Sequence, residues 1–396
     1  MDISEPESPR GAAWLRLGFR PFFLAAGSYA VVGMLFWFAA YSLNWTLPFA
    51  GISAMTWHAH EMIFGYSLAV IAGFLLAAVG NWTGLQTVRG TPLLLLFLAW
   101  LLARLLLLGE TAWLIYAAAF DLLFMASLAL AITAPILRAR QWGNLGIVAI
   151  VLLLLGSNLL FYLGAGGWLE QGVYLGLYSG LYLILGLVLV MSRRVVPFFI
   201  ERGVGYPVEL RNSRIIDVTS LLVFLVFWLA DLYQPNGVVV AWSAVVLVLL
   251  HGIRLQGWYT SGIWRKPLLW SLYLAHLAII LGFGLKALVY YVDLSPYLAL
   301  HAYAVGGIGL ITLGMMARVI LGHTGRAVSD PPGAVFWLFA VLIVAMLVRV
   351  ALPILHIERY ALWIGLSQWL WIIAFSGFLL VYAPMLVHSR VDGKDG

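Results

Sequence analysis

The chain contains no cysteine among its 396 residues. This absence excludes disulfide bonds, cysteine-ligated iron–sulfur clusters and copper sites built on thiolates. It also excludes haem attached covalently through a C-x-x-C-H motif. Any metal ion or haem iron must therefore be held by histidine, methionine, carboxylate or backbone groups.

Charged residues are scarce as well. They make up 10% of the chain, whereas soluble domains have about a quarter, and 64% of the residues are hydrophobic, with a mean hydropathy of +1.01. This composition indicates an integral membrane protein. The net charge of +6 does not indicate a nucleic-acid partner, because basic residues gathered at one face of a membrane account for it.

Apolar runs of about 18 to 25 residues, each long enough to cross a bilayer core of about 30 Å, predict an all-α membrane protein with twelve transmembrane helices. The runs cover residues 20–42, 57–80, 92–109, 111–135, 145–165, 171–191, 215–233, 238–256, 267–291, 297–321, 332–353 and 363–387. They form one transmembrane domain, residues 20–388, between an N-terminal segment, 1–19, and a tail, 389–396. The longest connection, 192–214, is expected to contain an interfacial turn at 197–200.

The lysines and arginines predict the orientation of these spans. All of them except Arg104, Lys286, Arg349 and Arg359 fall in the N-terminal segment, the tail, or the connections and span ends on that same side. Because cytoplasmic loops carry the excess of lysine and arginine, both termini are expected in the cytoplasm.

A weak internal repeat relates the second and tenth spans. His60 and His301 each begin the pattern H-x4-G-x7-G-x9-T-G, and the fragments MSRRV (191–195) and MMARV (315–319) resemble each other. The spacing suggests three four-helix units. Glycines are common in apolar helices, so a chance match is the alternative.

Ionisable groups inside a span are costly, which makes them candidates for function. His58, His60 and Glu61 begin the second span, and His301 begins the tenth span at the same outer face. We expect them to converge on one metal site, with the histidines as ligands and Glu61 as the catalytic proton carrier. Residues two apart point to different sides of a helix, so both early histidines reach one ion only if His58 precedes the regular helix. Hydrogen-bonded packing of the histidines and a helix-dipole role for Glu61 are the alternatives.

A second histidine group lies near the cytoplasmic face. His251 and His276 are on consecutive antiparallel spans, about 8 and 14 Å from that boundary, and are expected to be haem ligands. His323 either caps this site or faces lipid headgroups, and Trp57 and Trp258 could wall a cofactor. Histidines at two depths predict two redox centres, or one haem and one copper.

Four further charged groups lie within spans. Arg104 and Asp121 are expected to pair across the hairpin of the third and fourth spans. Lys286 and Arg349 are expected to snorkel toward the outer interface or to bind haem propionates.

Three stretches together resemble the NnrS family of bacterial membrane proteins: GFRPFFL (18–24), WHAHEMIFGY (57–66) and MMARVILGHTGR (315–326). The likeness extends over nearly the whole chain. It implies a twelve-helix, multi-pass protein of the bacterial inner membrane that contains non-covalent haem b and copper and is linked to denitrification and to protection against nitric oxide.

The matching motifs also carry site residues. His58, His60 and Glu61 stand in one motif, and the resemblance adds three cofactor-binding candidates in another: Arg318, His323 and Arg326. Imidazole suits both haem iron and copper, and an exchangeable axial position would let nitric oxide bind.

Three functions remain open at this point. The first is a haem and copper protein that binds nitric oxide or a nitrosyl-metal species and limits nitrosative damage. The second is a redox enzyme that turns over nitric oxide with electrons from a membrane donor. The third is a secondary carrier or an exporter of haem or metal, which twelve helices and a repeat would also suit.

Overall fold

A computed structural model describes residues 12–393, and within that range the protein is helical, with no strand. Eleven of its helical segments are long and apolar enough to cross a membrane, and the shorter helix Thr91–Leu106 occupies the position of the third predicted span. The predicted all-α, multi-pass membrane architecture is therefore confirmed. Arg10 and Lys394, two residues behind the predicted orientation, lie outside the described range.

The α-helices follow the predicted order of spans. They are α1 (Phe19–Ser42), α2 (Ala54–His60), α3 (Leu68–Thr83), α4 (Thr91–Leu106), α5 (Leu114–Arg138), α6 (Leu145–Ala165), α7 (Gly172–Gly203), α8 (Arg214–Tyr233), α9 (Val238–Gly257), α10 (Pro267–Tyr291), α11 (Pro296–His301), α12 (Leu310–His323), α13 (Ala334–Leu355) and α14 (Tyr360–Val387). Of these, α2 and α11 are short helices that continue through a π-helix into α3 and α12.

Local sequence signals set many of these boundaries. Proline occupies the first turn of α4, α10 and α11, where its missing N–H has no helical partner to lose. Ser53 and Ser213 cap α2 and α8 through their side chains. Gly84 ends α3 in the left-handed conformation, with φ of 67°, which favours glycine because it has no Cβ.

The predicted interfacial turn at residues 197–200 is wrong. Helix α7 continues through Pro197 to Gly203 and is 32 residues long. At about 1.5 Å per residue it is roughly 48 Å long, enough to reach beyond a bilayer core. Its final turns can therefore include a proline outside the apolar region, and the connection to α8 shortens to residues 204–213.

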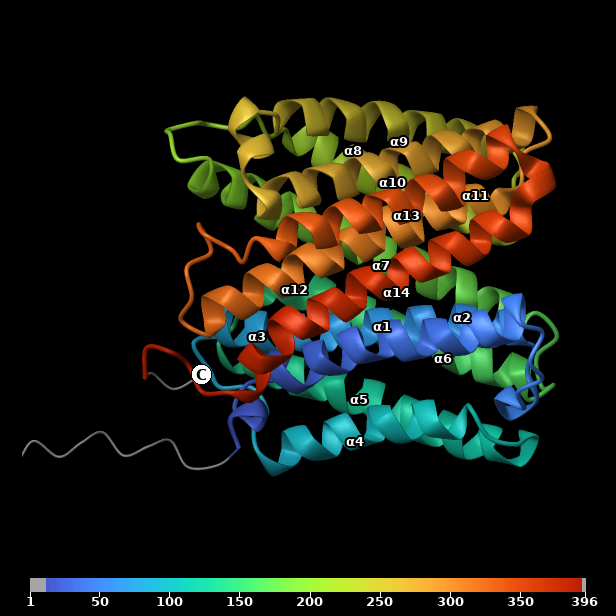
Figure 1. Cartoon of the computed structure of the whole chain (residues 1–396), viewed down its shortest axis with the longest axis horizontal. Helices are drawn as coiled ribbons and strands as arrows, with labels where there is room; N and C mark the ends of the chain where they lie inside the picture. Colours follow the sequence, from blue (N-terminus) through green and yellow to red (C-terminus); the bar gives the residue numbers. More distant parts are fainter. Residues whose placement is uncertain (1–11, 394–396) are drawn as a thin grey trace, which may run out of the picture.

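Both described chain ends lie at the same end of the bundle, which we call the termini end (Figure 1). Helix α1 packs beside α14, and Nη1 of Arg20 donates to the carbonyls of Leu386 at 3.0 Å and His388 at 2.7 Å. The opposite end carries α2 and α11. An even number of spans explains why the two chain ends meet.

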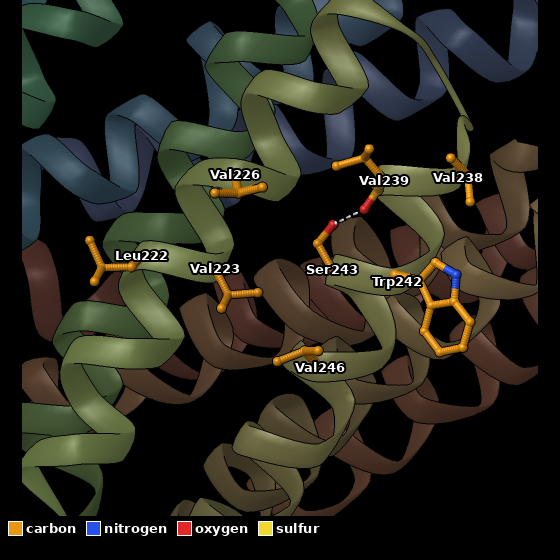
Figure 2. A pocket seen from close by; sticks show the side chains of 8 residues that line it. All are labelled: Leu222, Val223, Val226, Val238, Val239, Trp242, Ser243 and Val246. Carbon is orange, nitrogen blue, oxygen red and sulfur yellow. Dashed lines mark hydrogen bonds between the residues drawn. The ribbon is translucent and has the colours of Figure 1, made fainter.

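The outer surface of the bundle carries large apolar side chains, as a lipid-facing surface requires. Leu130 is 72% exposed and Leu380 is 81% exposed. An apolar groove of about 470 Å³ lies on this surface between α8 and α9 (Figure 2). Ser243 is its only residue with a polar side chain apart from Trp242, and its hydroxyl donates to the carbonyl of Val239 at 2.6 Å. None of the predicted site residues lines this groove.

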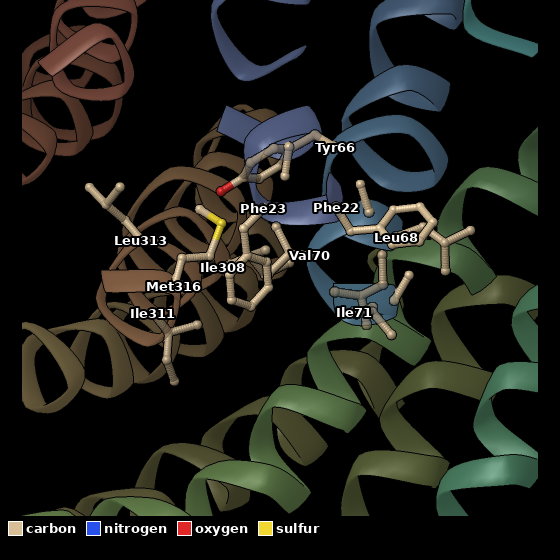
Figure 3. Close-up of a cluster of buried hydrophobic side chains, with 14 of the residues drawn as sticks. Phe22, Phe23, Tyr66, Leu68, Val70, Ile71, Ile308, Ile311, Leu313 and Met316 are labelled. Atoms are coloured by element: carbon tan, nitrogen blue, oxygen red, sulfur yellow. The ribbon is translucent and has the colours of Figure 1, made fainter. Parts of the chain in front are cut away.

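One part of the buried interior lies where α1, α3 and α12 meet (Figure 3). Phe22 and Phe23 of α1 pack in the same buried cluster as apolar residues of α3 and α12. The hydroxyls of Tyr66 and Thr312 form a hydrogen bond of 2.6 Å across it. This contact joins the two helices that the sequence repeat relates.

Both of those helices contain a π-helix at matching positions. One runs Glu61–Ser67, directly after His60, and the other runs Ala302–Gly309, directly after His301. A π-helix is rare and is often found at functional sites. Its recurrence at aligned positions supports duplication over chance, and it directs attention to the residues around the two histidines.

Candidate functional site

The residues predicted to share one outer site fall into two groups. The first is a buried cluster centred on His60 and Glu61, whose side chains are fully buried. Nδ1 of His60 lies 2.8 Å from Oε1 of Glu61, and its Nε2 lies 2.9 Å from Oδ1 of Asn158 on α6. Tyr29 of α1 donates its hydroxyl to Oε2 of Glu61.

The same cluster contains an ion pair across the α4–α5 hairpin. Nη2 of Arg104 lies 2.6 Å from Oδ2 of Asp121, and its Nε lies 3.3 Å from Oε2 of Glu61. Asp121 also accepts hydrogen bonds of 3.0 Å from Nδ2 of Asn158 and from the hydroxyl of Tyr162. The predicted pairing of Arg104 with Asp121 is confirmed.

Both ring nitrogens of His60 lie within hydrogen-bond distance of side-chain oxygens. His60 would have to give up one of these contacts to bind a metal ion, and its role as a ligand stays a prediction. Glu61 faces a guanidinium, an imidazole and a phenol, and this arrangement suits the holding or passing of a proton.

The second group contains His58, His301 and Arg349 of α13. The two histidines lie within electrostatic range of each other, and each also lies within range of the guanidinium of Arg349. His58 stacks on Trp37, with ring centroids 4.5 Å apart and ring planes 5° apart, and its Nδ1 is buried without a hydrogen-bond partner. Nδ1 of His301 lies 2.7 Å from the carbonyl of Tyr297. A ring held in this way by Nδ1–H presents Nε2 as a free ligand atom.

The histidines nearer the termini end do come together. The rings of His251 on α9 and His276 on α10 have centroids 5.3 Å apart, at 62°, and both side chains are buried. Nε2 of His251 and both ring nitrogens of His276 are buried without a hydrogen-bond partner. Trp258 lies against His276 at 5.1 Å and Phe283 stacks on His251 at 6.0 Å. Buried polar atoms almost always have partners, so three unpartnered ring nitrogens in one pair suit residues that hold a metal ion.

Arg254 connects this pair with the termini end of the bundle. Its Nη1 lies 2.9 Å from Nδ1 of His251, and its Nη2 lies 3.0 Å from Oδ1 of Asp217. Arg254 also lines a polar pocket of about 590 Å³ beneath the connection between α7 and α8. The pocket therefore allows polar molecules to reach Arg254, which contacts His251 of the pair.

The remaining predicted residues lie elsewhere. His323 contacts Phe19 of α1, with ring centroids 5.3 Å apart, and not the pair on α9 and α10. Arg318 places its guanidinium 3.9 Å from the ring of Phe199, and Arg326 makes a long bond of 3.5 Å to the carbonyl of Thr324.

Trp57 is fully buried beside the residues of the second group. Its ring stacks on Phe49 at 4.5 Å and meets Phe36 edge-on at 6.2 Å, and its Nε1 has no hydrogen-bond partner. Trp57 therefore forms part of an aromatic interior near His58, which is consistent with a wall for a cofactor.

The sequence model of one protein family, described as NnrS protein, matches residues 13–390. This chain belongs to the NnrS family. Among curated proteins, none matches the chain. Membership confirms the resemblance carried by the three motifs, and it suggests a membrane protein of the nitric oxide response, in a family associated with metal or haem binding.

The number of metal-ligating side chains that come together in this NnrS protein limits which metal or cofactor it could bind. Across residues 12–393, no three histidine, aspartate or glutamate side chains come together as a metal-binding set. Each histidine pair therefore offers two imidazoles. Axial ligation of haem iron needs one or two such ligands, and imidazole also suits copper, so the residues fit the groups that the family implies.

The NnrS sequence also contains a second buried charge pair that the motifs did not indicate. Nζ of Lys286 lies 2.9 Å from Oδ1 of Asp231, and Asp231 accepts a hydrogen bond of 2.5 Å from the hydroxyl of Tyr182. Nζ of Lys286 also donates to Oδ1 of Asn236, in the connection between α8 and α9, at 2.7 Å. Lys286 therefore reaches the end of the bundle as expected, but it does so as a buried group paired with a carboxylate of α8. The sequence could have indicated this pair through Asp231, a carboxylate near the end of the apolar run 215–233.

Proposed function

We propose that this protein is a haem- and copper-binding membrane protein that binds nitric oxide or a nitrosyl-metal species and limits nitrosative damage. The observation that carries the proposal is the His251–His276 pair, with three buried ring nitrogens that lack partners. Leaving such groups unsatisfied costs about 1–3 kcal/mol each. Coordination of a metal would remove that cost.

The two histidine pairs suit different groups. Metal–imidazole bonds are about 2 Å long, so a single ion can bridge rings whose centroids lie 5.3 Å apart. Trp258 and Phe283 close this pair on two sides, which favours a copper-sized ion over a porphyrin. This assignment replaces our expectation from the sequence that His251 and His276 are the haem ligands.

The other pair is better suited to a flat aromatic ligand. His58 and His301 are only half-buried, and Trp37 lies parallel to the ring of His58. When bound, haem supplies an iron with an exchangeable position for nitric oxide. The protein contributes the imidazole of His301, oriented by the carbonyl of Tyr297, and an apolar surround that an uncharged gas can enter from the lipid.

The test is a visible spectrum and a metal analysis of the protein purified in detergent, reduced and then exposed to nitric oxide without oxygen. A haem Soret band that shifts with nitric oxide, together with stoichiometric copper, is the expected result. A preparation that contains neither haem nor copper and cannot be reconstituted would contradict the proposal and favour a carrier.

The buried cluster around Glu61 favours one second candidate, a redox enzyme that consumes nitric oxide. Catalytic reduction needs protons, and Glu61 and His60 are joined by a contact of 2.8 Å that could hold or pass one inside the bundle. Asn158 anchors this pair to Asp121. Consumption of many equivalents of nitric oxide per protein with a chemical reductant would establish turnover. Binding that stops at one equivalent per haem would exclude it.

A further inference from the structure

Arg349 differs from the other deeply buried basic residues of the bundle. Its side chain is only 7% exposed, and it lies six residues before the end of α13. Arg104, Arg254 and Lys286 each pair with an aspartate. Arg20 is held by the carbonyls at the end of α14. No carboxylate among residues 12–393 forms an ion pair with Arg349, and its Nη1 is buried without a hydrogen-bond partner.

The groups around Arg349 do not supply negative charge. Its guanidinium lies 5.6 Å from the ring centroid of Tyr360, and Tyr41 lies within electrostatic range of both. The nearby titratable groups are the imidazoles of His58 and His301. Hydrogen-bond donors and aromatic faces therefore converge on a cation that has no counter-ion.

An uncompensated charge at this depth is expensive, and such residues usually have a partner. A bare metal cation between His58 and His301 would also be repelled by the guanidinium. An anion removes both difficulties. A guanidinium presents two parallel N–H groups that match a planar oxyanion.

We propose that Arg349, together with His58 and His301, binds a planar monovalent oxyanion of the carboxylate or nitrite type. Two sources supply that chemistry. One is a propionate group of a porphyrin held between the histidines, and the other is free nitrite, the oxidation product of nitric oxide. Only the choice between propionate and nitrite rests on the proposed function. The anion site itself rests on the guanidinium of Arg349, which has no carboxylate partner among the described residues.

The first experiment measures anion binding by the protein purified in detergent and chloride-free buffer. Sodium nitrite and sodium formate are titrated while thermal unfolding is followed by tryptophan fluorescence, since a ligand that binds only the folded state raises the unfolding temperature. Wild type that carries no haem is expected to be stabilised by both salts. Arg349→Gln is expected to lose at least tenfold in affinity.

Two further variants test whether the loss of affinity comes from the charge and the planar shape of Arg349, and not from a general loss of folding. Arg194→Gln removes another arginine whose guanidinium lies over an aromatic ring, 5.4 Å from the ring centroid of Trp82, and should bind both anions as wild type does. Arg349→Lys keeps the charge but loses the planar fork, so its affinity should be intermediate. If Arg349→Gln does not fold, equal nitrite affinity of Arg349→Lys and wild type overturns the proposal.

The second experiment identifies the source. If a propionate is the anion, Arg349→Gln should retain several-fold less haem than Arg194→Gln. In that case the haem-loaded wild type should not respond to nitrite, and wild type should fail to take up haem dimethyl ester. If free nitrite is the anion, the haem content should be unchanged in Arg349→Gln, and loaded wild type should bind nitrite.

The outcomes also separate this proposal from the proposed function. A metal-free protein that binds nitrite through Arg349 supports the anion site while the cofactor proposal fails. A protein that contains haem and copper, but whose haem retention and nitrite affinity are the same in wild type and Arg349→Gln, overturns the anion site alone.

Discussion

Removing the guanidinium of Arg104 is the most informative test of the buried cluster. This side chain is 1% exposed and lies between the carboxylates of Asp121 and Glu61, at 2.6 and 3.3 Å. Arg104→Met keeps an unbranched apolar chain of similar length. It leaves two buried carboxylates without their guanidinium, held only by His60 and by the neutral donors Tyr29, Asn158 and Tyr162.

The expected loss of stability follows from that geometry. Removing one partner of a buried ion pair costs about 3–5 kcal/mol, because the remaining charge is buried without compensation. Asp121→Asn should cost less, since Glu61 still pairs with Arg104. In the double variant the two losses should not add, and a coupling energy of about 1–3 kcal/mol is expected for residues in direct contact.

The assay is equilibrium unfolding in mixed micelles with increasing denaturing detergent, followed by the fluorescence of the 18 tryptophans. Arg138→Met is the matched control, because it removes an exposed arginine at the end of α5 and should leave stability nearly unchanged. An Arg104→Met protein within about 1 kcal/mol of wild type would refute the reasoning, since that is the range of ordinary surface substitutions.

Three other predictions follow from single contacts. His276→Ala should remove copper while the haem spectrum persists, as measured by metal analysis and absorbance, and loss of the Soret band instead would return His276 to the haem. Gly306→Ala should lower the free energy of unfolding by about 1–3 kcal/mol through overpacking, because the added Cβ would lie 2.7 Å from the Cβ of Ala278. Gly284→Ala is the control, since the nearest atom to its added Cβ is 3.9 Å away, and it should not destabilise the protein. Arg20→Ala removes charged hydrogen bonds to the end of α14, each worth about 1.5–3 kcal/mol, so limited proteolysis of the tail should quicken about tenfold or more, and an unchanged rate would show that other contacts hold it.

The helices could be predicted closely from the sequence because a bilayer imposes a fixed length of apolar residues on each span. The first span was expected at 20–42 and lies at Phe19–Ser42, and the ninth was expected at 267–291 and lies at Pro267–Tyr291. Pro197 predicts an early end for the sixth span because proline removes a helical hydrogen bond, yet α7 continues past it to Gly203.

The contacts between helices were harder to predict. The pairing of His251 with His276 followed from their depths on neighbouring antiparallel helices. The separation of His58 from Glu61 could not be predicted in this way. A π-helix begins at Glu61, and it has more residues per turn than the α-helix from which shared faces are inferred. Asn158 and Tyr162 complete the cluster from α6, and a single sequence does not indicate which face of a distant helix will meet a given residue.

The ion pair between Arg104 and Asp121 also bears on how the protein enters the membrane. Helix α4 has only 16 residues, and an arginine within a span opposes insertion by about 2.5–3.5 kcal/mol. Helix α5 carries the aspartate that neutralises this charge. The two segments should therefore leave the translocation channel together as a hairpin, and α4 presented alone should fail to integrate in a glycosylation-mapping assay.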